Sequence, residues 1–459
     1  MIKTLPRLLL AAPSSGQGKT TLTLALLRAF ELAGKHPVAF KSGPDYIDPM
    51  FHRRVLGLPS YNLDLFLSDA PTATRLLAEC GGSGDVALIE GAMGYYDGVG
   101  VTDAASAWNL ARTTNTPVIF LLSAKGAALS LAATVRGFDS LRRPSQLAGV
   151  ILNRCAKAFY DRAAPVIAHE TGLPVLGFLP ELPECTLQSR HLGLVTADEI
   201  AGLSQKLDRL GEAALQHIDL QALLGLAQAA PPLEFMPQAV TPLPHRVRLA
   251  VARDDAFCFY YDETLSLFEA LGAELVFFSP LNDGSLPSNI QALYLGGGYP
   301  ELHAGRLSQN RAMLADIRNA IAGGMPCLAE CGGFLYLHEQ LQDDKGVFYP
   351  MAGVVPATAA GGTRLGRFGY ITLAARRNNL LCCAGEALLA HEFHYWQSDG
   401  CGDAFKAQKP DGRSWDAVHA TSSLFAGFPH LYLQGNVTAA KNFLAAAAAY
   451  GEGYGLSGA

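Results

Sequence analysis

Short apolar runs alternate with helix-length segments through the first half of the chain. The runs are rich in Val, Ile and Leu, and they read RLLLAAP, PVAFKSGPDY, DVALIEGAMG, TPVIFLLSAK, LAGVILNR and PVLGFLP. Nearly continuous apolar strands are typical of a parallel sheet that helices cover on both faces. One further helical stretch is predicted from about residue 196 to residue 230. Residues 1–230 are therefore predicted to form an α/β domain.

A proline-rich stretch separates the two halves of the chain. Residues 231–246 contain five prolines, which are incompatible with a helix or a central strand and predict an interdomain linker. The strand and helix pattern then restarts in residues 247–459 with RVRLAVARDDAF, AELVFFSPL, ALYLGGGYPEL and MPCLAECGGFLYL. The second half is predicted to be another α/β domain.

The first apolar run leads into a sequence that is typical of a phosphate-binding loop. The usual pattern is G-x-x-x-x-G-K-[ST], and here Pro13 occupies the position of the first glycine. A strand, a loop of small residues and a helix follow one another as this motif requires, so we expect backbone N–H groups to bind phosphate. The residues expected to contact the nucleotide are Ser15, Gly16, Gly18, Lys19, Thr20 and Thr21.

Acidic residues follow other strands of the first half and should meet the phosphate loop at one edge of the sheet. Ligands of open parallel sheets bind at the carboxyl ends of the strands. Thr20, Asp45 and Glu90 supply the oxygen ligands that Mg²⁺ prefers, so they form the predicted metal site. Asp48 and Asp97 are further candidates, although each stands beside a residue that favours turns, and a purely structural role is an equal alternative for both.

Cys331 lies between an apolar strand and a predicted helix, directly before two glycines. This arrangement predicts a nucleophile elbow, in which a sharp turn exposes the thiol and the start of the helix lowers its pKa. Backbone N–H groups of Gly297, Gly298 and Gly332 are the predicted oxyanion hole. The thiol also needs a base, and the residues alone do not rank His430 above His394 or His419.

Composition limits the partners of the chain. The net charge of −6 gives no reason to expect nucleic acid binding, and no apolar run approaches the length of about 20 residues that a membrane span requires. Nine cysteines without a C-x-x-C pair favour reduced thiols in the cytoplasm. The basic and apolar start is similar to a signal peptide, but cleavage after it would remove the phosphate loop, so export is not expected.

Ordered motifs along nearly the whole chain resemble those of the cobyrinate a,c-diamide synthase family. They read APSSGQGKTT, KSGPDYIDP, IEGAMGYYDG, ILNR, RHLGLV, VARDDAFCFYY, LVFFSPL, YLGGGYPELHA, AECGGFLYL and HEFHYW. The resemblance implies an N-terminal P-loop domain like that of dethiobiotin synthetase and a C-terminal class I glutamine amidotransferase domain of the cobyric acid synthase type. It also accounts for Pro13, because the family's own loop lacks the first glycine.

The resemblance assigns roles to residues in both halves. It implies that Cys331 is the glutaminase nucleophile and that His430 activates it. The usual class I enzyme has a glutamate two residues after this histidine; here Tyr432 stands there, and a Cys-His dyad is implied. Asp45, Tyr46, Asp48 and Asp97 are the implied substrate-binding residues. Basic candidates for binding a corrinoid polycarboxylate are Lys41, Arg53, Arg54, Arg190 and His191.

The implied reaction is ATP-dependent amidation of the a and c carboxylates of cobyrinate, or of cobalt-free hydrogenobyrinate, through acyl phosphates. Nitrogen would come from glutamine or ammonia, Mg²⁺ would accompany ATP, and a homodimer is the expected assembly. The alternatives are a cobyric acid synthase, a nickel-sirohydrochlorin a,c-diamide synthase, and a non-catalytic P-loop regulatory ATPase with an inactive amidase domain. The motifs KSGPDYIDP and HEFHYW argue against the cobyric acid synthase.

Overall fold

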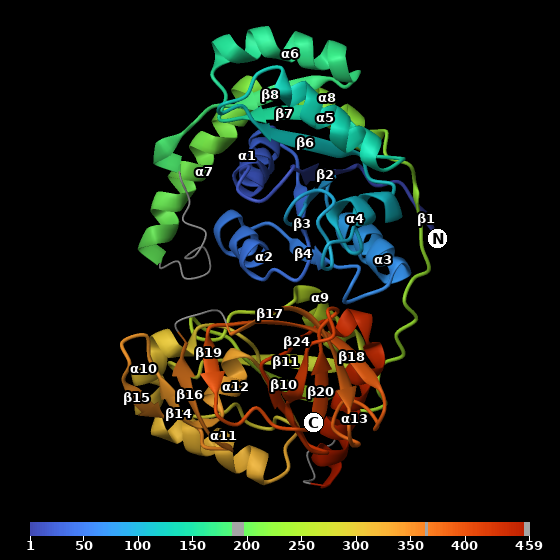
Figure 1. The fold of residues 1–459 in the computed structure, drawn as a ribbon. Coiled ribbons are helices and arrows are strands. Elements are labelled where there is room, and N and C mark those ends of the chain that lie inside the picture. The colour runs from blue at the N-terminus through green and yellow to red at the C-terminus, as the bar shows by residue number, and fades with distance from the viewer. Residues whose placement is uncertain (186–196, 363–365, 454–459) are drawn as a thin grey trace. The chain divides into compact units, whose positions relative to one another are not determined.

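The computed structural model describes residues 1–185, 197–362 and 366–453, and it divides into two units, 1–238 and 239–459 (Figure 1). The division lies within the proline-rich stretch 231–246. None of the helices in the described part of the chain combines the length and apolar character needed to cross a bilayer.

Unit 1 is built on a seven-stranded sheet whose neighbouring strands are all parallel. The order across the sheet is β4-β3-β5-β2-β6-β7-β8. Six strands coincide with the apolar runs of the sequence, which confirms the predicted parallel sheet, whereas β4 was not predicted because its sequence SYNL alternates polar and apolar residues. The bounds are β2 (Arg7–Ala11), β3 (Pro37–Ser42), β4 (Ser60–Leu63), β5 (Val86–Glu90), β6 (Val118–Ser123), β7 (Leu147–Asn153) and β8 (Val175–Leu179).

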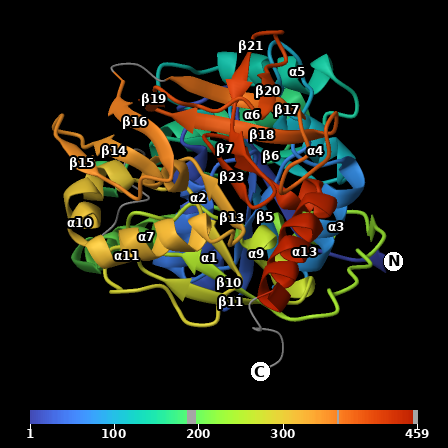
Figure 2. The ribbon, with the colours of Figure 1, turned by 90° about the horizontal axis from the view of Figure 1, so that it is seen from below.

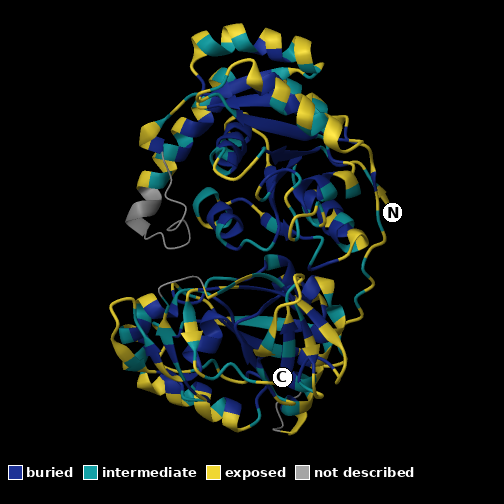
Figure 3. Ribbon diagram, in the orientation of Figure 1, coloured by how far each residue is buried: buried dark blue, intermediate teal, exposed yellow. Residues whose placement is uncertain are grey.

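Helices cover both faces of this sheet, so its strands are buried while the outer helix surfaces are exposed (Figure 3). One face packs against α1, α7 and α8 through a core that includes Leu8 and Leu10. On the other face the ring of Phe120 contacts Phe138 of α5. The bounds are α1 (Lys19–Leu32), α2 (Ile47–Phe51), α3 (Ala70–Gly81), α4 (Ala107–Thr113), α5 (Ser130–Leu141), α6 (Lys157–Thr171), α7 (Ala197–His217) and α8 (Leu220–Gln228), with a π-helix at His52–Leu56 after α2.

The helical stretch predicted near residues 196–230 is two helices. Between α7 and α8 the chain breaks at Asp219, whose carboxylate accepts a hydrogen bond from the N–H of Ala222 at 2.9 Å. Asp is a strong N-cap because it satisfies a backbone donor at the start of a helix, and the continuous apolar pattern concealed this boundary. After α8, β9 (Leu233–Glu234) pairs with the N-terminal β1 (Ile2–Lys3) in antiparallel fashion.

Unit 2 contains a six-stranded sheet in the order β11-β10-β12-β13-β23-β22. Every pairing in it is parallel except that of β22 with β23. Helices α9 and α13 pack on one face and α11 and α12 on the other. Figure 2 shows α11 and α13 on the two sides of this sheet. The bounds are β10 (Val247–Ala252), α9 (Asp262–Ala270), β11 (Ala273–Phe278), β12 (Ala292–Leu295), α10 (Ala304–Gln309), α11 (Arg311–Ala322), β13 (Cys327–Glu330), α12 (Gly332–Tyr336), β22 (His419–Ala420), β23 (Leu424–Gly427) and α13 (Val437–Gly453).

Two further sheets follow α12, and the pattern of apolar runs does not predict them. Their orders are β15-β14-β16-β19 and β21-β20-β17-β18-β24, and most of their pairings are antiparallel. Burial alternates along such strands, so they lack the continuous apolar runs that revealed the parallel strands. The bounds are β14 (His338–Gln342), β15 (Phe348–Pro350), β16 (Val355–Gly361), β17 (Arg367–Ala375), β18 (Ala387–His394), β19 (Trp396–Ser398), β20 (Phe405–Gln408), β21 (Ser414–Ala417) and β24 (His430–Leu431).

A buried arginine at the start of β2 joins distant segments of unit 1. The Arg7 side chain is fully buried and donates to the carbonyl oxygens of Leu5, Thr114, Asn115 and Pro231, and to the Thr116 hydroxyl. Burial lowers the pKa of Arg7 to about 10, so the group stays charged at neutral pH. The guanidinium therefore satisfies several buried acceptors at once.

We expect Arg7→Met to reduce the free energy of unfolding of unit 1 by about 3 kcal/mol, because it leaves these buried acceptors without donors. The measurement is denaturant unfolding of the full chain. The control is Arg136→Met, which removes an exposed arginine whose side chain donates to one carbonyl, that of Glu170. Equally small decreases in the free energy of unfolding of Arg7→Met and Arg136→Met would contradict the role given to Arg7.

Candidate active sites

The phosphate loop of unit 1 connects β2 to α1 and depends on a left-handed glycine. Gly18 has φ 95° at the N-cap of α1, a conformation that glycine adopts without strain. The Asn153 side chain, at the end of β7, donates to the carbonyl of Gln17 at 2.8 Å. A Cβ at Gly18 would lie 2.2 Å from the same amide nitrogen, so the loop also needs glycine for space. Sequence reasoning missed Asn153, which appears there only within the motif ILNR.

Lys19 and Thr20 lie at the start of α1 beside the carboxyl end of β5. The Lys19 ammonium donates to the carbonyls of Ser14 and Met93, and the Thr20 hydroxyl donates to Glu90 Oε1 at 2.7 Å. Burial lowers the pKa of Lys19, while the Glu90 carboxylate acts in the opposite direction. The structure thus brings together three predicted residues. Of the other loop residues, Ser15 and Gly16 are exposed and Thr21 is half-buried.

Lys41 lies at the centre of a carboxylate cluster. Its ammonium is 2.5 Å from Asp48 Oδ2, 2.8 Å from Glu90 Oε1 and 3.8 Å from Asp45 Oδ2. Although burial alone would lower it, these carboxylates raise the pKa of Lys41. Lys41, a basic candidate for binding a polycarboxylate, is thus paired with carboxylates of the protein itself, and its contact with a substrate stays a prediction.

Burial and ion pairing separate the two aspartates of this cluster. Desolvation, together with the charge of Asp48, raises the pKa of Asp45, whose side chain is 36% exposed. Burial opposes ionisation of Asp48 too, but the adjacent Lys41 ammonium holds its pKa below the ordinary value. Asp48 is thus an ion-pair partner of Lys41, while Asp45 Oδ1 accepts from the N–H of Ile47 at 2.8 Å.

The remaining predicted residues of unit 1 lie in several environments. Tyr46 is buried just before α2, and Asp97 Oδ2 accepts from the N–H of Gly94 at 3.0 Å. Arg53 donates to the carbonyl of Ser60, and Arg54 is exposed. Arg190 and His191 lie outside the described residues. Within residues 1–185, 197–362 and 366–453, no three His, Cys, Asp or Glu side chains gather as a ready-made metal site.

In unit 2, Cys331 forms a strained turn between β13 and α12. Its backbone has φ 46° and ψ −100°, an unfavourable conformation for a residue with a side chain. The turn is held by the Cys331 N–H, which donates to the carbonyl of Gly427 at 2.8 Å. A Cβ on Gly332 would lie 2.9 Å from the backbone nitrogen of Gly298, so the predicted loop of glycines packs directly against the elbow.

The expected lowering of the Cys331 pKa is wrong. Burial raises the pKa of this thiol, and the carboxylates of Glu301, Glu392 and Glu330 add to that effect. The N–H of Gly332 acts in the opposite direction but does not prevail. Helix α12 has five residues, which makes its dipole small. The resting thiol is therefore protonated and needs a base to become a nucleophile.

The three candidate histidines have different surroundings. His394 Nδ1 lies 2.6 Å from the carbonyl oxygen of Trp396, and His419 Nε2 lies 2.9 Å from that of Gly400. His430 is on β24, and its Cε1 would be 2.6 Å from a Cβ placed on Gly297. Of the three, His430 is thus the one that the structure places against the predicted oxyanion loop.

Sequence reasoning missed the buried carboxylates around the cysteine. Glu330 is the last residue of β13 and is fully buried, as is Glu392 on β18. Glu301 follows the glycine loop, and burial raises its pKa to about 7. The sequence AECGG could have indicated Glu330, because this acid ends an apolar strand directly before the cysteine.

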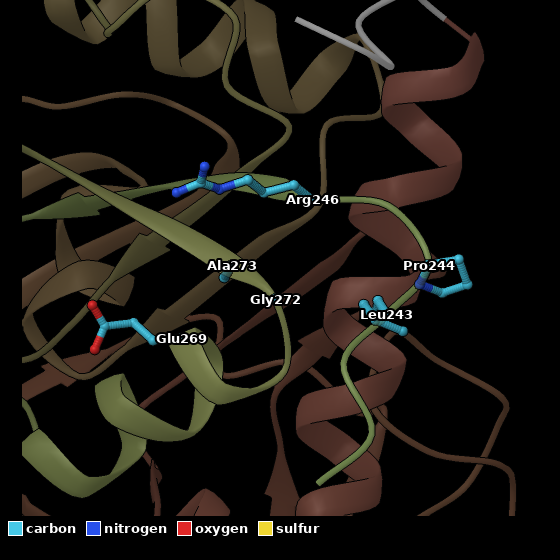
Figure 4. A pocket seen from close by; sticks show the side chains of 6 residues that line it. All are labelled: Leu243, Pro244, Arg246, Glu269, Gly272 and Ala273. Carbon is cyan, nitrogen blue, oxygen red and sulfur yellow. The ribbon is translucent and has the colours of Figure 1, made fainter.

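Figure 4 shows a surface pocket of unit 2 whose lining does not include Cys331. Its lining includes Ala273, which starts β11 and pairs with Val247 at the start of β10. Cys331 instead follows the carboxyl end of β13. The pocket is therefore at the edge of the parallel sheet opposite to Cys331. Its lining residues are Leu243, Pro244, Arg246, Glu269, Gly272 and Ala273.

Comparison with known proteins covers both units. Residues 8–195 match the model of the CobQ/CobB/MinD/ParA nucleotide binding domain, and residues 248–437 match that of the CobB/CobQ-like glutamine amidotransferase domain. The cobyrinate a,c-diamide synthase of Salmonella typhimurium is 39% identical over 448 residues, which cover 96% of this chain and 97% of that protein. The chain belongs to the cobyrinate a,c-diamide synthase family. A relative of the same name from Thermoplasma volcanium is 37% identical over 446 residues, 96% of each chain.

The buried Glu301 should make the stability of unit 2 depend on pH. Its pKa of about 7 exceeds the ordinary value of 4.5, so between these values the folded protein keeps a proton that the unfolded chain releases. The stability contributed by the neutral acid is therefore lost as pH rises toward 7. As pH rises from 4.5 to 8, we expect the free energy of unfolding of Glu301→Gln to increase by about 3 kcal/mol relative to that of the wild type.

The measurement is urea unfolding of wild type and Glu301→Gln at a series of pH values, followed by a probe of unit 2. A difference between the two proteins that stays constant across this range would contradict the buried, proton-holding state of Glu301.

Proposed function

We propose that this protein amidates the a and c carboxylates of cobyrinate, consuming ATP and taking nitrogen from glutamine or ammonia. The observation that supports the proposal is that one chain holds two groups of residues, each of which fits one half of the reaction. One is the loop with Lys19, Thr20 and Glu90, and the other is the elbow with Cys331 and His430. The names of the relatives support the choice of substrate.

The first centre activates the carboxylate. A carboxylate does not exchange an oxide ion for ammonia, so the carboxylate oxygen first attacks the γ-phosphorus of ATP and ADP leaves. Ammonia then attacks the acyl phosphate carbon, and phosphate departs. Backbone N–H groups of the loop and the Lys19 ammonium would hold the phosphates and stabilise charge on the transferred group.

The residues beside the loop fit Mg²⁺. Glu90 Oε2 is buried without a hydrogen-bond partner, and Oε1 of the same carboxylate accepts from Thr20. Thr20, Asp45 and Glu90 would hold the ion, which binds readily to a few protein oxygens together with substrate phosphates. When bound, Mg²⁺ neutralises phosphate charge. The Lys41 ammonium offsets the carboxylates nearby and thereby makes the site tolerable for an anionic substrate.

The second centre releases ammonia from glutamine. His430 would accept the Cys331 proton as the sulfur attacks the side-chain amide carbon, and N–H groups of Gly297, Gly298 and Gly332 would stabilise the oxyanion. The imidazolium then gives its proton to the departing ammonia, and water hydrolyses the thioester to glutamate. This order of steps follows from a thiol that is protonated at rest.

The substrate contacts and the setting of the enzyme remain predictions. Asp45 and Tyr46 follow β3, Asp48 lies in α2 directly after them, and Asp97 follows β5; we propose that they contact the substrate. The requirement for ATP favours the cytoplasm, and the homodimer is the assembly we propose. Neither nucleic acid nor a membrane is needed for this chemistry.

We expect Cys331→Ser to abolish glutamine-dependent amidation and to leave ammonia-dependent amidation within about twofold of the wild type, because the nucleophile serves only glutamine. Both rates are measured by mass spectrometry of the corrinoid product. The control is Cys383→Ser, which changes an exposed cysteine of the same unit. Loss of both activities in Cys331→Ser, in a protein that is folded, would contradict the division of labour.

We expect Lys19→Ala to lower amidation by at least about 100-fold with either nitrogen source, because removal of one charge-stabilising group in phosphoryl transfer costs on the order of 10²-fold or more. Glutamine hydrolysis without ATP should continue. Lys35→Ala, at an exposed lysine after the same helix, is the matched control. Normal amidation by Lys19→Ala would refute the assignment of the phosphate loop.

A further inference from the structure

We infer that Glu330 is the positioning acid of the glutaminase centre: it orients His430 and holds the imidazole for proton transfer from Cys331. The inference rests on the proposed function and adds a third member to the pair of Cys331 and His430. It differs from the usual class I arrangement, because this acid precedes the cysteine in the sequence instead of following the histidine.

The side chains of Glu330 and His430 face each other inside unit 2. Glu330 Oε2 is 3.9 Å from His430 Nδ1, and both side chains are nearly inaccessible to solvent. Hydrogen bonds of catalytic groups are often long without substrate and shorten when it binds. A small shift of the imidazole would therefore bring Nδ1 within hydrogen-bond distance of the carboxylate.

Glu330 is itself held in place from two sides. Its Oε1 accepts from the N–H of Leu431 at 3.1 Å, and its Oε2 accepts from the Tyr294 hydroxyl at 3.2 Å. Leu431 is the neighbour of His430 in β24, so the same carboxylate also anchors the backbone that carries the histidine. A fixed acid can select one tautomer and one orientation of an imidazole, which a flexible group cannot do.

Tyr432, which occupies the position of the usual class I glutamate, has a packing role instead. Tyr432 is buried, and its ring packs edge-on against Tyr261 with centroids 5.0 Å apart. A tyrosine carries no negative charge at neutral pH and cannot stabilise an imidazolium as a carboxylate does. The carboxylate comes instead from Glu330, the last residue of β13, which directly precedes Cys331. The end of β13 therefore positions both Cys331 and the acid that faces His430.

Other titratable groups approach this pair from neighbouring elements. His391 lies opposite His430 across β18 and β24, and burial lowers its pKa to about 3, which keeps it neutral. Tyr294 contacts Glu330, and burial raises its pKa. Glu301 and Glu392 act on Cys331. Glu330 is the carboxylate for which the structure gives a direct approach to His430.

The test is steady-state glutamine hydrolysis by full-length Glu330→Gln. We expect kcat to fall on the order of 10²-fold or more with little change in KM, because the positioning acid acts on proton transfer and not on glutamine binding. Ammonia-dependent amidation should be unchanged. The control is Glu263→Gln, which places the same amide at another buried carboxylate of unit 2. A kcat within about threefold of the wild type would overturn the inference.

A double-mutant comparison separates positioning from a general structural role. If Glu330 acts through His430, Glu330→Gln should add less than about twofold to the loss caused by His430→Ala. The readout is the rate at which iodoacetamide alkylates Cys331, followed by mass spectrometry of its peptide, which does not require turnover. If Glu330→Gln lowered the alkylation rate of Cys331 by the same factor in the presence and in the absence of His430, the inference would be overturned.

A measurement on the wild-type protein remains available if the variant does not fold. We expect NMR of ¹⁵N-histidine-labelled full chain to show neutral His430 with its proton on Nδ1, as a carboxylate acceptor requires. A proton on Nε2 would contradict the inference. Failure of the proposed function itself would appear differently, as a wild-type protein or a Cys383→Ser variant that does not hydrolyse glutamine.

Discussion

Covering both faces of a parallel sheet leaves the ends of its strands as the places where polar chemistry can be built. Both units of this protein obey that constraint. In unit 1 the strand β5 ends at Glu90, and in unit 2 the strand β13 ends at Glu330. Each glutamate is buried, and each stands beside the group to which we assign the chemistry. That group is the Lys19 and Thr20 loop in one unit and Cys331 in the other.

Buried carboxylates have to be paired with a cation or with hydrogen-bond donors, and this pairing explains much of each site. In unit 1 the Lys41 ammonium is surrounded by Asp48, Glu90 and Asp45, which turns a cluster of repelling acids into a paired network. In unit 2 the Glu330 carboxylate is held by a backbone N–H and a tyrosine hydroxyl. The first network sets the charge beside the proposed phosphate loop, whereas the second keeps an acid close to the imidazole of His430.

The sequence predicted the parallel sheets, the phosphate loop and the cysteine elbow because each has a strong local pattern. Strand β4 and the antiparallel strands after α12 were missed, since their apolar residues alternate with polar ones and form no continuous run. The role of Lys41 and the raised pKa of Cys331 could not be predicted, because both follow from burial and from neighbours that are distant in sequence. The contact between Glu330 and His430 joins residues on different strands and emerges only from the fold.

The most direct test of this account is the fate of the amide nitrogen of glutamine. Purified protein is incubated with ATP, Mg²⁺, cobyrinate and glutamine labelled with ¹⁵N in its side-chain amide, and the corrinoid is analysed by mass spectrometry. The account predicts a product with two labelled amides, formed only when ATP is present. Hydrolysis of ATP and glutamine without labelled nitrogen in the corrinoid would contradict it.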